Sequence, residues 1–337
     1  MILVGDIGGT NTRLAMYERR GGALRPAVEA NFKSRDHSSL DEMVLAFTNQ
    51  AKLPVERACF GVAGPVKDGR ISASNLAWIV DSRTLARILH LDKVYLLNDL
   101  QAIAYGVMAL SPSDVVVLRQ GQAMPGNRGV IAAGTGLGEA GLFWDGARLY
   151  PFASEGGHAD FAPRNELEIE LFRYLFAKFG HVSYERILSG PGLVNVYQFL
   201  RDTKRDPEPP WLAEELAHAD PGAVISRFAL SGKSALCEHA LDLFIDVYGA
   251  EAGNCALRFV ALNGIFVAGG IAPKILPKFS DPRFLAAFAG KGRLKTLLES
   301  IPVSVVTNEK VGLLGSAHYA STIVEEPLGM PALEARP

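Results

Sequence analysis

The chain has 337 residues, which fits about two domains, and 48% of them are hydrophobic and 21% charged. This hydrophobic fraction, with 17 Phe, excludes a disordered chain, and 34 Gly without a three-residue period exclude a collagen. With 34 basic and 36 acidic residues the net charge is −2, so nucleic acid and anionic membranes lack their usual electrostatic attraction and we expect neither as a partner.

The first third of the chain alternates short apolar runs with Gly- and Asp-containing turns. A buried strand that ends at Asp6, followed by a turn at residues 8–11, predicts a hairpin. Ser39 and Asp81 stand where helix caps belong. The same patterns predict further strands at 57–63 and 94–98 and helices at about 40–51, 82–90 and 99–110.

A second hairpin pattern follows at residues 129–146, with a Gly/Thr turn at 134–138. Two such hairpins, each opening an α/β segment, predict a duplicated fold of two lobes with a cleft between them; chance similarity is the alternative. Residues 203–222 are charged and Pro-rich, which predicts an exposed loop. Helices are predicted at 165–179 and about 234–262, and a strand at 264–272 that ends in a Gly-Gly turn.

The segment Asp6-Ile7-Gly8-Gly9-Thr10 is the first candidate for binding chemistry. Glycine N–H groups and a Thr hydroxyl can hold phosphate oxygens. A strand-end carboxylate such as Asp6 can hold Mg²⁺, usually through water. A plain Gly-rich hairpin turn is the alternative.

Two further glycine turns, Gly134–Gly138 and Gly269-Gly270, could bind the same ligand. The first is not a dinucleotide fingerprint, because Glu139 stands where the third glycine belongs and a strand follows in place of a helix. Two Gly/Thr turns could grip one polyphosphate, and the third turn could let an adenine lie against bare backbone. A turn that only packs a helix is the alternative for Gly269-Gly270.

Polar side chains at the ends of predicted strands and turns are the candidates for catalysis. Asp99 follows a buried strand, which suits either a general base or an ordinary helix N-cap. Glu155 and His158 flank two glycines, so they form a turn and not a helical metal motif, and they could pair with the hydroxyls of a ligand. Glu185, taken alone, has the pattern of a surface helix residue.

The three cysteines, Cys59, Cys237 and Cys255, are widely separated, and no pair has metal-ligand spacing. We therefore predict buried thiols in a reducing compartment, with neither a disulfide nor a zinc site. The start of the chain has no signal-peptide pattern, and no apolar run reaches the roughly 18 residues of a membrane span. These observations predict a cytoplasmic protein.

Taken together, these motifs resemble those of the bacterial hexokinase-type glucokinases, relatives of hexokinase, actin and the heat-shock ATPases. The segments that carry the resemblance follow the family's order and are GDIGGTN (5–11), FGVAGPV (60–66), NLAWIVD (75–81), LLNDLQA (96–102), GTGLG (134–138), EGGHADFAP (155–163), GHVSYERILSGPGL (180–193), VAGGI (267–271) and GLLGSAH (312–318). The resemblance implies an α/β, actin/hexokinase-like ATPase fold, in which each of two lobes is a mixed sheet flanked by helices. The expected parts are a small lobe at 1–110 with a return segment at about 311–325, a large lobe at 111–310 and a flexible tail at 326–337.

The resemblance also assigns roles to individual residues. It implies that Asn98 and Asp99 contact the sugar, with Asp99 as catalytic base, and that Glu155, His158 and Glu185 bind other sugar hydroxyls. Asn75 is a further candidate for sugar contact. The ATP-binding residues implied are Gly5, Asp6, Ile7, Gly8, Gly9 and Thr10 in the first loop, Gly134, Thr135 and Gly136 in the second, and Gly269 and Gly270 on the adenosine side.

The activity implied is phosphorylation of D-glucose at its 6-hydroxyl by MgATP, in a homodimer without a tightly bound cofactor. Related repressors and sugar kinases usually carry a Cys-rich zinc motif, but no cysteine occurs here between Cys59 and Cys237, which disfavours that branch. A kinase for another hexose or an N-acetylated amino sugar is the runner-up, and a non-catalytic sugar sensor is the alternative from another class. The sequence leaves open whether the phosphoryl donor is ATP, ADP or polyphosphate.

Overall fold

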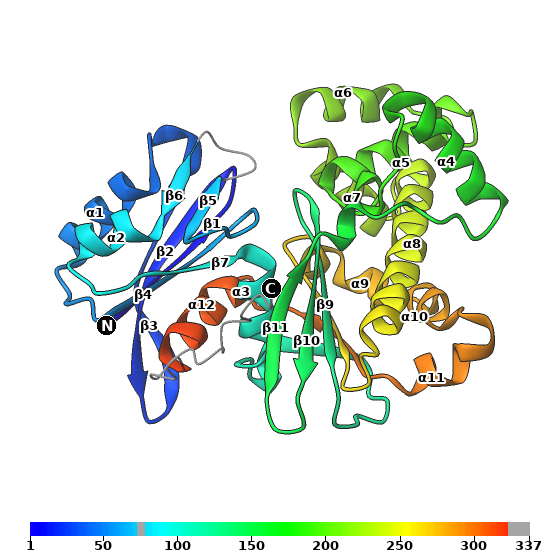
Figure 1. Ribbon diagram of the computed structural model, residues 1–337. Helices are drawn as coiled ribbons and strands as arrows, with labels where there is room; N and C mark the ends of the chain where they lie inside the picture. Colours follow the sequence, from blue (N-terminus) through cyan, green and yellow to red (C-terminus); the bar gives the residue numbers. More distant parts are fainter. Residues whose placement is uncertain (73–77, 323–337) are drawn as a thin grey trace, which may run out of the picture. The chain divides into compact units, whose positions relative to one another are not determined.

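The computed structural model describes residues 1–72 and 78–322, and the chain divides into two compact units (Figure 1). Unit 1 combines Met1–Ala109 with the segment that begins at Gly312, and unit 2 comprises Leu110–Val311. Each unit contains one large mixed sheet with helices packed on it. The predicted α/β class, with two sheets flanked by helices, is confirmed.

The sheet of unit 1 has five strands in the order β3-β2-β1-β4-β7. The first three strands in the sequence pair antiparallel, whereas β1, β4 and β7 run parallel. Parallel strands end at one edge of a sheet, where ligands of α/β folds bind. The strands are β1 (Ile2–Ile7), β2 (Asn11–Arg20), β3 (Ala23–Lys33), β4 (Arg57–Val62) and β7 (Tyr95–Asn98), and a separate pair is formed by β5 (Arg70–Ser72) and β6 (Ile79–Asp81).

Alternation along β1 divides the core of unit 1 between the two faces of its sheet. Leu3 and Ile7 belong to the cluster that includes side chains of α1 and α2, whereas Val4 belongs to the cluster of α3 and α12. Asp6 follows Val4 by two residues, so its carboxylate lies on the α3 and α12 side. The helices are α1 (Leu40–Ala51), α2 (Ser82–Leu89), α3 (Asp99–Val107) and α12 (Val311–Thr322).

The sheet of unit 2 repeats this arrangement and adds one strand, in the order β11-β10-β9-β12-β13-β8. Again three consecutive strands pair antiparallel, and β9, β12 and β13 run parallel. The predicted duplication of a hairpin that opens an α/β segment is therefore present in the fold. The strands are β8 (Val115–Arg119), β9 (Arg128–Ala133), β10 (Leu137–Trp144), β11 (Leu149–Ser154), β12 (Ile265–Ala268) and β13 (Val303–Val306).

Helix α8 lies at the centre of unit 2 and is buried along most of its length. Its Tyr248 is fully buried and its hydroxyl accepts a hydrogen bond from the backbone N–H of Ala133, at a distance of 3.2 Å. This contact joins the helix to the end of β9. The helices of unit 2 are α4 (Glu166–Phe179), α5 (Gly190–Asp202), α6 (Pro210–His218), α7 (Pro221–Leu230), α8 (Ala235–Phe259), α9 (Leu276–Phe279), α10 (Pro282–Ala289) and α11 (Lys295–Ser300).

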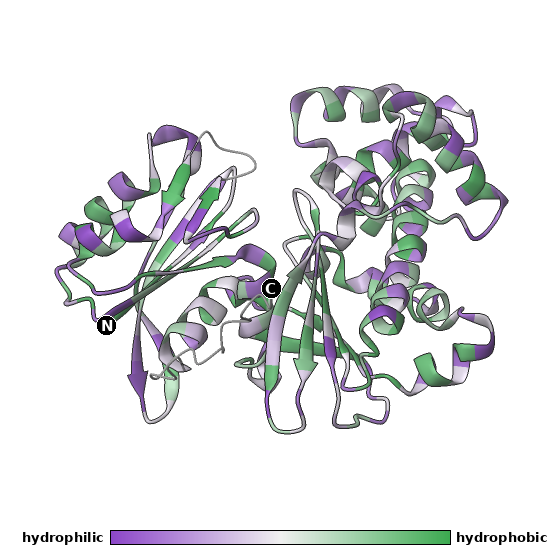
Figure 2. Cartoon of the chain, in the orientation of Figure 1, coloured by the Kyte–Doolittle hydropathy of each residue, from purple (hydrophilic) through white to green (hydrophobic). Residues whose placement is uncertain are grey.

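Hydrophobic residues follow the strands of the unit 2 sheet and α8, as Figure 2 shows. Cys59, Cys237 and Cys255 are buried, as predicted. Within residues 1–72 and 78–322, no helix combines the length and the apolar character that a membrane crossing requires.

The expectation of an exposed loop at residues 203–222 is wrong. Helix α6 begins at Pro210, because proline is well suited to the first position of a helix, and it runs to His218. Its Leu212 is fully buried in the core of unit 2, and the Trp211 ring packs edge-on against that of Phe228 at 5.0 Å. Of the charged residues that suggested a loop, Glu214 and Glu215 lie on this helix and are exposed, and the others precede or follow it.

Replacement of Leu212 by alanine tests this docking of α6. Removal of a fully buried leucine side chain lowers the free energy of unfolding by about 2–5 kcal/mol. Urea denaturation measures the loss, with the exposed Glu214→Ala on the same helix as the control, which we expect to change stability by about 0.5 kcal/mol or less. Equal stability of the two variants would show that α6 does not pack as described.

Candidate active site

The parallel strands of unit 1 bring the predicted Asp6 and Asp99 to the same edge of its sheet. The register pairs Ile7 with Val62, and Val62 in turn with Asn98. Asp6 precedes this row by one residue and Asp99 follows it by one. Two strand spacings separate β1 from β7, which amounts to about 10 Å.

The turn after β1 is held by hydrogen bonds to Ser34, a residue that the sequence patterns did not indicate. The hydroxyl of the buried Ser34 donates to the carbonyl oxygen of Gly8 at 2.7 Å and contacts the Thr12 hydroxyl at 3.0 Å. The Ser34 N–H donates to the carbonyl oxygen of Thr10, also at 3.0 Å. The turn is thereby fixed, with Gly9 at its tip.

Gly5 and Ile7 have a packing role in this segment. A Cβ added at Gly5 would lie 2.6 Å from the Phe60 ring, and the Ile7 side chain is buried in the core. Neither residue therefore offers a side chain to a ligand.

Asp6 lies beside the start of α12. A Cβ added at Gly312, the second residue of that helix, would be 3.5 Å from the Asp6 carboxyl carbon. Burial raises the pKa of Asp6, and the positive charge of Arg13 opposes this shift. A desolvated carboxylate gains from a nearby cation, so this oxygen ligand fits a hydrated Mg²⁺.

Asn98, and not Asp99, is the N-cap of α3. The side-chain oxygen of Asn98 accepts from the N–H groups of Leu100 at 3.0 Å and Gln101 at 3.3 Å. Its amide nitrogen donates to the carbonyl oxygen of Gly64 at 3.2 Å, and Gly64 has a φ of 128° that only glycine adopts readily. This capping leaves Asp99 as the first helical residue, half-buried, where the positive end of the helix stabilises its carboxylate.

In unit 2, Glu155, His158 and Glu185 come together at the β9–β10 turn. The Glu185 carboxylate accepts from the Leu137 N–H at 2.9 Å, and His158 Nδ1 lies 3.9 Å from its other oxygen. His158 Nε2 is 4.0 Å from the Glu155 carboxylate. The surface-helix interpretation of Glu185 is therefore wrong: its side chain is 31% exposed and lies in a 3-10 turn, Tyr184–Arg186.

Glycines allow this assembly. A Cβ at Gly136 would lie 2.5 Å from the Glu185 carboxylate, and one at Gly157 would lie 2.0 Å from the carbonyl oxygen of Leu137. The 3-10 turn Gly156–His158 can therefore rest directly on the start of β10. The second phosphate-loop candidate, with Gly134 in open space and Thr135 exposed, is adjacent to this turn.

The third glycine turn lies next to the second. Strands β9 and β12 are parallel neighbours with Ala132 opposite Ala268, so the turns that follow them share an edge. Gly269 has a φ of 87°, and a Cβ there would lie 2.3 Å from the carbonyl oxygen of Ala133. A Cβ at Gly270 would meet nothing within 4 Å, which leaves its backbone open to a ligand.

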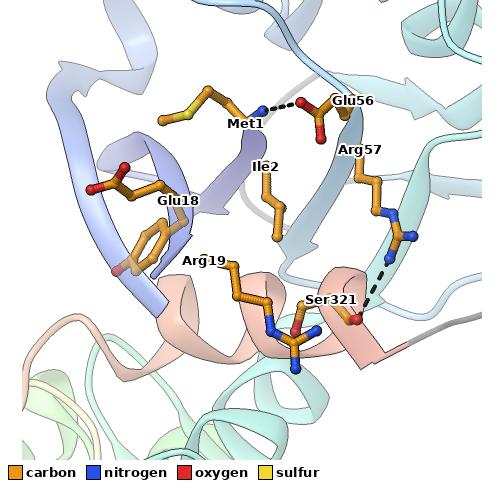
Figure 3. Close-up of a pocket in the computed structure, with 8 residues that line it drawn as sticks. Met1, Ile2, Glu18, Arg19, Glu56, Arg57 and Ser321 are labelled. Atoms are coloured by element: carbon orange, nitrogen blue, oxygen red, sulfur yellow. Dashed lines mark hydrogen bonds and ion pairs between the residues drawn. The ribbon is translucent and has the colours of Figure 1, made fainter. Parts of the chain in front are cut away.

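A pocket in unit 1 lies at the opposite edge of the sheet from Asp6 (Figure 3). Its lining includes Met1 and Ile2, at the start of β1, and Arg57, at the start of β4. Arg57 donates to the carbonyl oxygen of Ala320 at the end of α12. Because ligands of such folds bind at the carboxyl ends of the parallel strands, this pocket is separate from the candidate site.

Comparison with known proteins identifies the family. A glucokinase family model matches residues 3–323. The glucokinase of Nostoc sp. is 43% identical over 340 residues, which cover 96% of this chain and 99% of that protein. Among solved structures, a glucokinase from an Antarctic psychrotroph has a TM-score of 0.81 and 31% identity, covering 95% of this chain and 98% of that one. A glucokinase from Balamuthia mandrillaris, in complex with glucose, shares the fold with a TM-score of 0.77 and 23% identity, covering 95% of this chain and 93% of that one.

The two-unit α/β fold and the similarity to glucokinases over nearly the whole chain lead to the same conclusion. The chain belongs to the glucokinase family. The resemblance noted in the sequence is thereby confirmed. One predicted sugar-contact residue, Asn75, lies outside the described residues.

Gly157→Ala tests the close approach of the two turns of unit 2. The added methyl group would collide with the carbonyl oxygen of Leu137, which costs about 1–3 kcal/mol of stability and displaces Glu155 and His158. Urea denaturation and the KM for glucose measure the two effects. Gly126→Ala is the control, because its methyl group would meet its nearest neighbour at an ordinary 3.4 Å. A Gly157→Ala enzyme with unchanged stability and KM would contradict the described turn.

Proposed function

We propose that Asp99 is the catalytic base of this family member's reaction, the ATP-dependent phosphorylation of D-glucose at its 6-hydroxyl. The observation that carries this proposal is the position of Asp99 at the carboxyl edge of the parallel strands and at the first turn of α3. As the 6-oxygen forms its bond to the γ-phosphorus of ATP, the bond from that phosphorus to the β,γ-bridging oxygen breaks and ADP leaves. The proton of the 6-hydroxyl passes to the Asp99 carboxylate.

Asn98 supports Asp99 in this role. Its amide is engaged with the start of α3 and with Gly64, so it holds the residue that follows it. One N–H of the Asn98 amide remains for a sugar hydroxyl beyond its bond to Gly64. We propose that Asn98 combines this contact with its capping.

Glu155, His158 and Glu185 are proposed to bind the other sugar hydroxyls. Carboxylates accept hydrogen bonds from hydroxyl groups, and imidazole can donate or accept. The His158 ring lies between the two carboxylates, with one nitrogen 4.0 Å from Glu155 and the other 3.9 Å from Glu185. A sugar that lacks one of the matching hydroxyls leaves a polar group unpaired, which gives selectivity.

The glycine turns are proposed to bind ATP. Backbone N–H groups of Gly9 and Thr10, and of Thr135 and Gly136, suit phosphate oxygens. The N–H groups of Gly8 and Gly134 instead donate within their own turns, to the carbonyl oxygens of Asn11 and Gly136, and thereby shape the two loops. Gly269 and Gly270 would contact the adenosine, and Gly5 and Ile7 would contribute through their backbone alone. Mg²⁺ enters as part of the substrate MgATP, and Asp6 would hold it through water; the ion supplies charge that offsets the phosphates.

Further proposals rest on the family resemblance. They are a cytoplasmic homodimer without zinc or a tightly bound cofactor, and a division into a small lobe at 1–110, with a return segment at about 311–325, and a large lobe at 111–310. The expected flexible tail at 326–337 lies outside the described residues.

Asp99→Asn tests the catalytic base. The amide cannot accept the proton, so kcat falls by about 10²–10⁴-fold, whereas the similar size of the side chain keeps the Kd for glucose within a few-fold. A coupled assay for glucose 6-phosphate and a glucose titration measure the two quantities. The exposed Asp92→Asn, just before β7, is the matched control and retains wild-type turnover. Near-normal kcat in Asp99→Asn would remove Asp99 from this role.

A further inference from the structure

A polar cluster is buried in unit 2 between β10 and α8. Glu139 is 1% exposed and Glu251 is fully buried, although carboxylates are rarely found at such depth. The Arg258 guanidinium forms ion pairs with both, at 3.3 Å from the Glu139 carboxylate. Cys255 completes the cluster. The mechanism proposed above uses none of these side chains.

Two carboxylates facing one guanidinium leave one negative charge uncompensated. Glu251 is well partnered, since its other oxygen accepts from the Asn254 amide at 2.7 Å. In the described part of the chain, no N–H or O–H group donates a hydrogen bond to either carboxyl oxygen of Glu139. Burial and the charge of Glu251 raise the pKa of Glu139 to about 8. A single proton held by the two carboxyls would make the charges of the cluster balance.

The other titratable groups around the cluster do not supply that balance. Burial raises the pKa of the Cys255 thiol well above its usual value, and it also raises those of Tyr184 and Tyr248. Burial lowers the pKa of Lys291, with a further lowering by the charge of Arg164. Lys291 instead donates to the side-chain oxygen of Asn254 at 2.5 Å. Across neutral pH, the carboxyl pair is therefore the group that gains or loses a proton.

Glu139 also supports the turn that carries Glu155 and His158. A Cβ added at Gly156 would lie 2.2 Å from a Glu139 carboxyl oxygen, so the turn rests directly on that carboxyl group. The carbonyl oxygen of Glu139 accepts from the Ser154 hydroxyl at 3.0 Å, and that hydroxyl accepts from the Gly156 N–H at 3.2 Å. Both the side chain and the backbone of Glu139 thus contact this turn.

We propose that Glu139 and Glu251 share one proton beside Arg258, and that Glu139 in this state is a positioning residue for Glu155 and His158. The inference rests on the proposed sugar-binding role of those two residues. Loss of the proton puts a second negative charge next to Glu251, and the resulting repulsion displaces the turn above Glu139. Glucose binding then weakens at alkaline pH, while the chemistry at Asp99 is unaffected.

A metal ion is the competing occupant, because ligand atoms of Glu139, Glu251 and Cys255 lie within 4.8 Å of one another. The Arg258 guanidinium already contacts both carboxylates and takes the place of a cation. We therefore favour the shared proton. Tight stoichiometric binding of Zn²⁺ to the wild type that is lost in Cys255→Ser would overturn this assignment.

Glu139→Gln provides the kinetic test. As the wild-type pair loses its proton, the KM for glucose rises by about tenfold between pH 7 and pH 9, because the fraction of enzyme able to bind glucose falls. Loss of this proton changes kcat little. In Glu139→Gln, which holds no titrating proton, this rise is absent; the exposed Glu214→Gln follows the wild type. The same alkaline rise in Glu139→Gln would overturn the proposal. If Glu139→Gln does not fold, Glu251→Gln replaces it in the test, because it also eliminates the pair of carboxyl groups that shares the proton.

Thermal unfolding provides a readout that does not depend on sugar binding. A carboxyl group whose pKa is raised in the folded state stabilises the protein at low pH, and this stability is lost as the pH rises toward the folded pKa of about 8. The melting temperature of the wild type relative to Glu139→Gln therefore falls between pH 5 and pH 8 and then levels off. A difference independent of pH would exclude the shared proton.

Glu155→Gln separates the two proposals. If the thermal shift is present but Glu155→Gln leaves the KM for glucose unchanged, the sugar-binding role of Glu155 fails and the shared proton stands. If Glu155→Gln raises KM and the thermal shift is present, but the KM of the wild type shows no alkaline rise, Glu139 does not position the turn.

Discussion

The site in unit 2 depends on one close approach, between the backbone of Gly157 and the carbonyl oxygen of Leu137. No residue with a Cβ fits there, because that atom would lie 2.0 Å from the oxygen. This approach places the turn with Glu155 and His158 on the start of β10. The N–H of Leu137 is at the same time donated to Glu185, so a single residue of β10 anchors both polar segments. The proposed sugar-binding chemistry thus depends on a residue without a side chain.

The two large sheets share one strand arrangement. Each contains an antiparallel hairpin whose first strand also pairs with a parallel strand, and each has a glycine turn where that first strand ends. Unit 1 adds Asp6 and Asp99 at this edge, and unit 2 adds the Glu155, His158 and Glu185 group. A sugar kinase must bind a sugar and the phosphates of ATP, and it must supply a base that accepts a proton. The duplicated topology provides matching positions for these groups, and the proposed function draws on both units.

Local patterns predicted much of this arrangement. Strand ends and glycine turns are set by short-range rules, so Asp6, the turn at 134–136 and Gly269 could be found from the sequence. Neighbouring residues with similar capping ability are harder to separate: the pattern suits Asp99 as the N-cap of α3, whereas the structure places Asn98 there. Ser34 and Glu139 act through contacts with residues distant in the sequence. No spacing rule indicates such contacts, and the Pro-rich composition around α6 concealed its single buried leucine.

The most direct measurement is a comparison of specificity constants with MgATP for five sugars: glucose, fructose, mannose, N-acetylglucosamine and N-acetylmannosamine. Formation of the sugar 6-phosphate is followed in each case. We predict a kcat/KM for glucose well above that for every other sugar in this set, because the polar groups of unit 2 are proposed to pair with the hydroxyls of glucose. A preference for an amino sugar would contradict the proposed substrate. Tight glucose binding without turnover of any sugar would contradict the proposed catalysis.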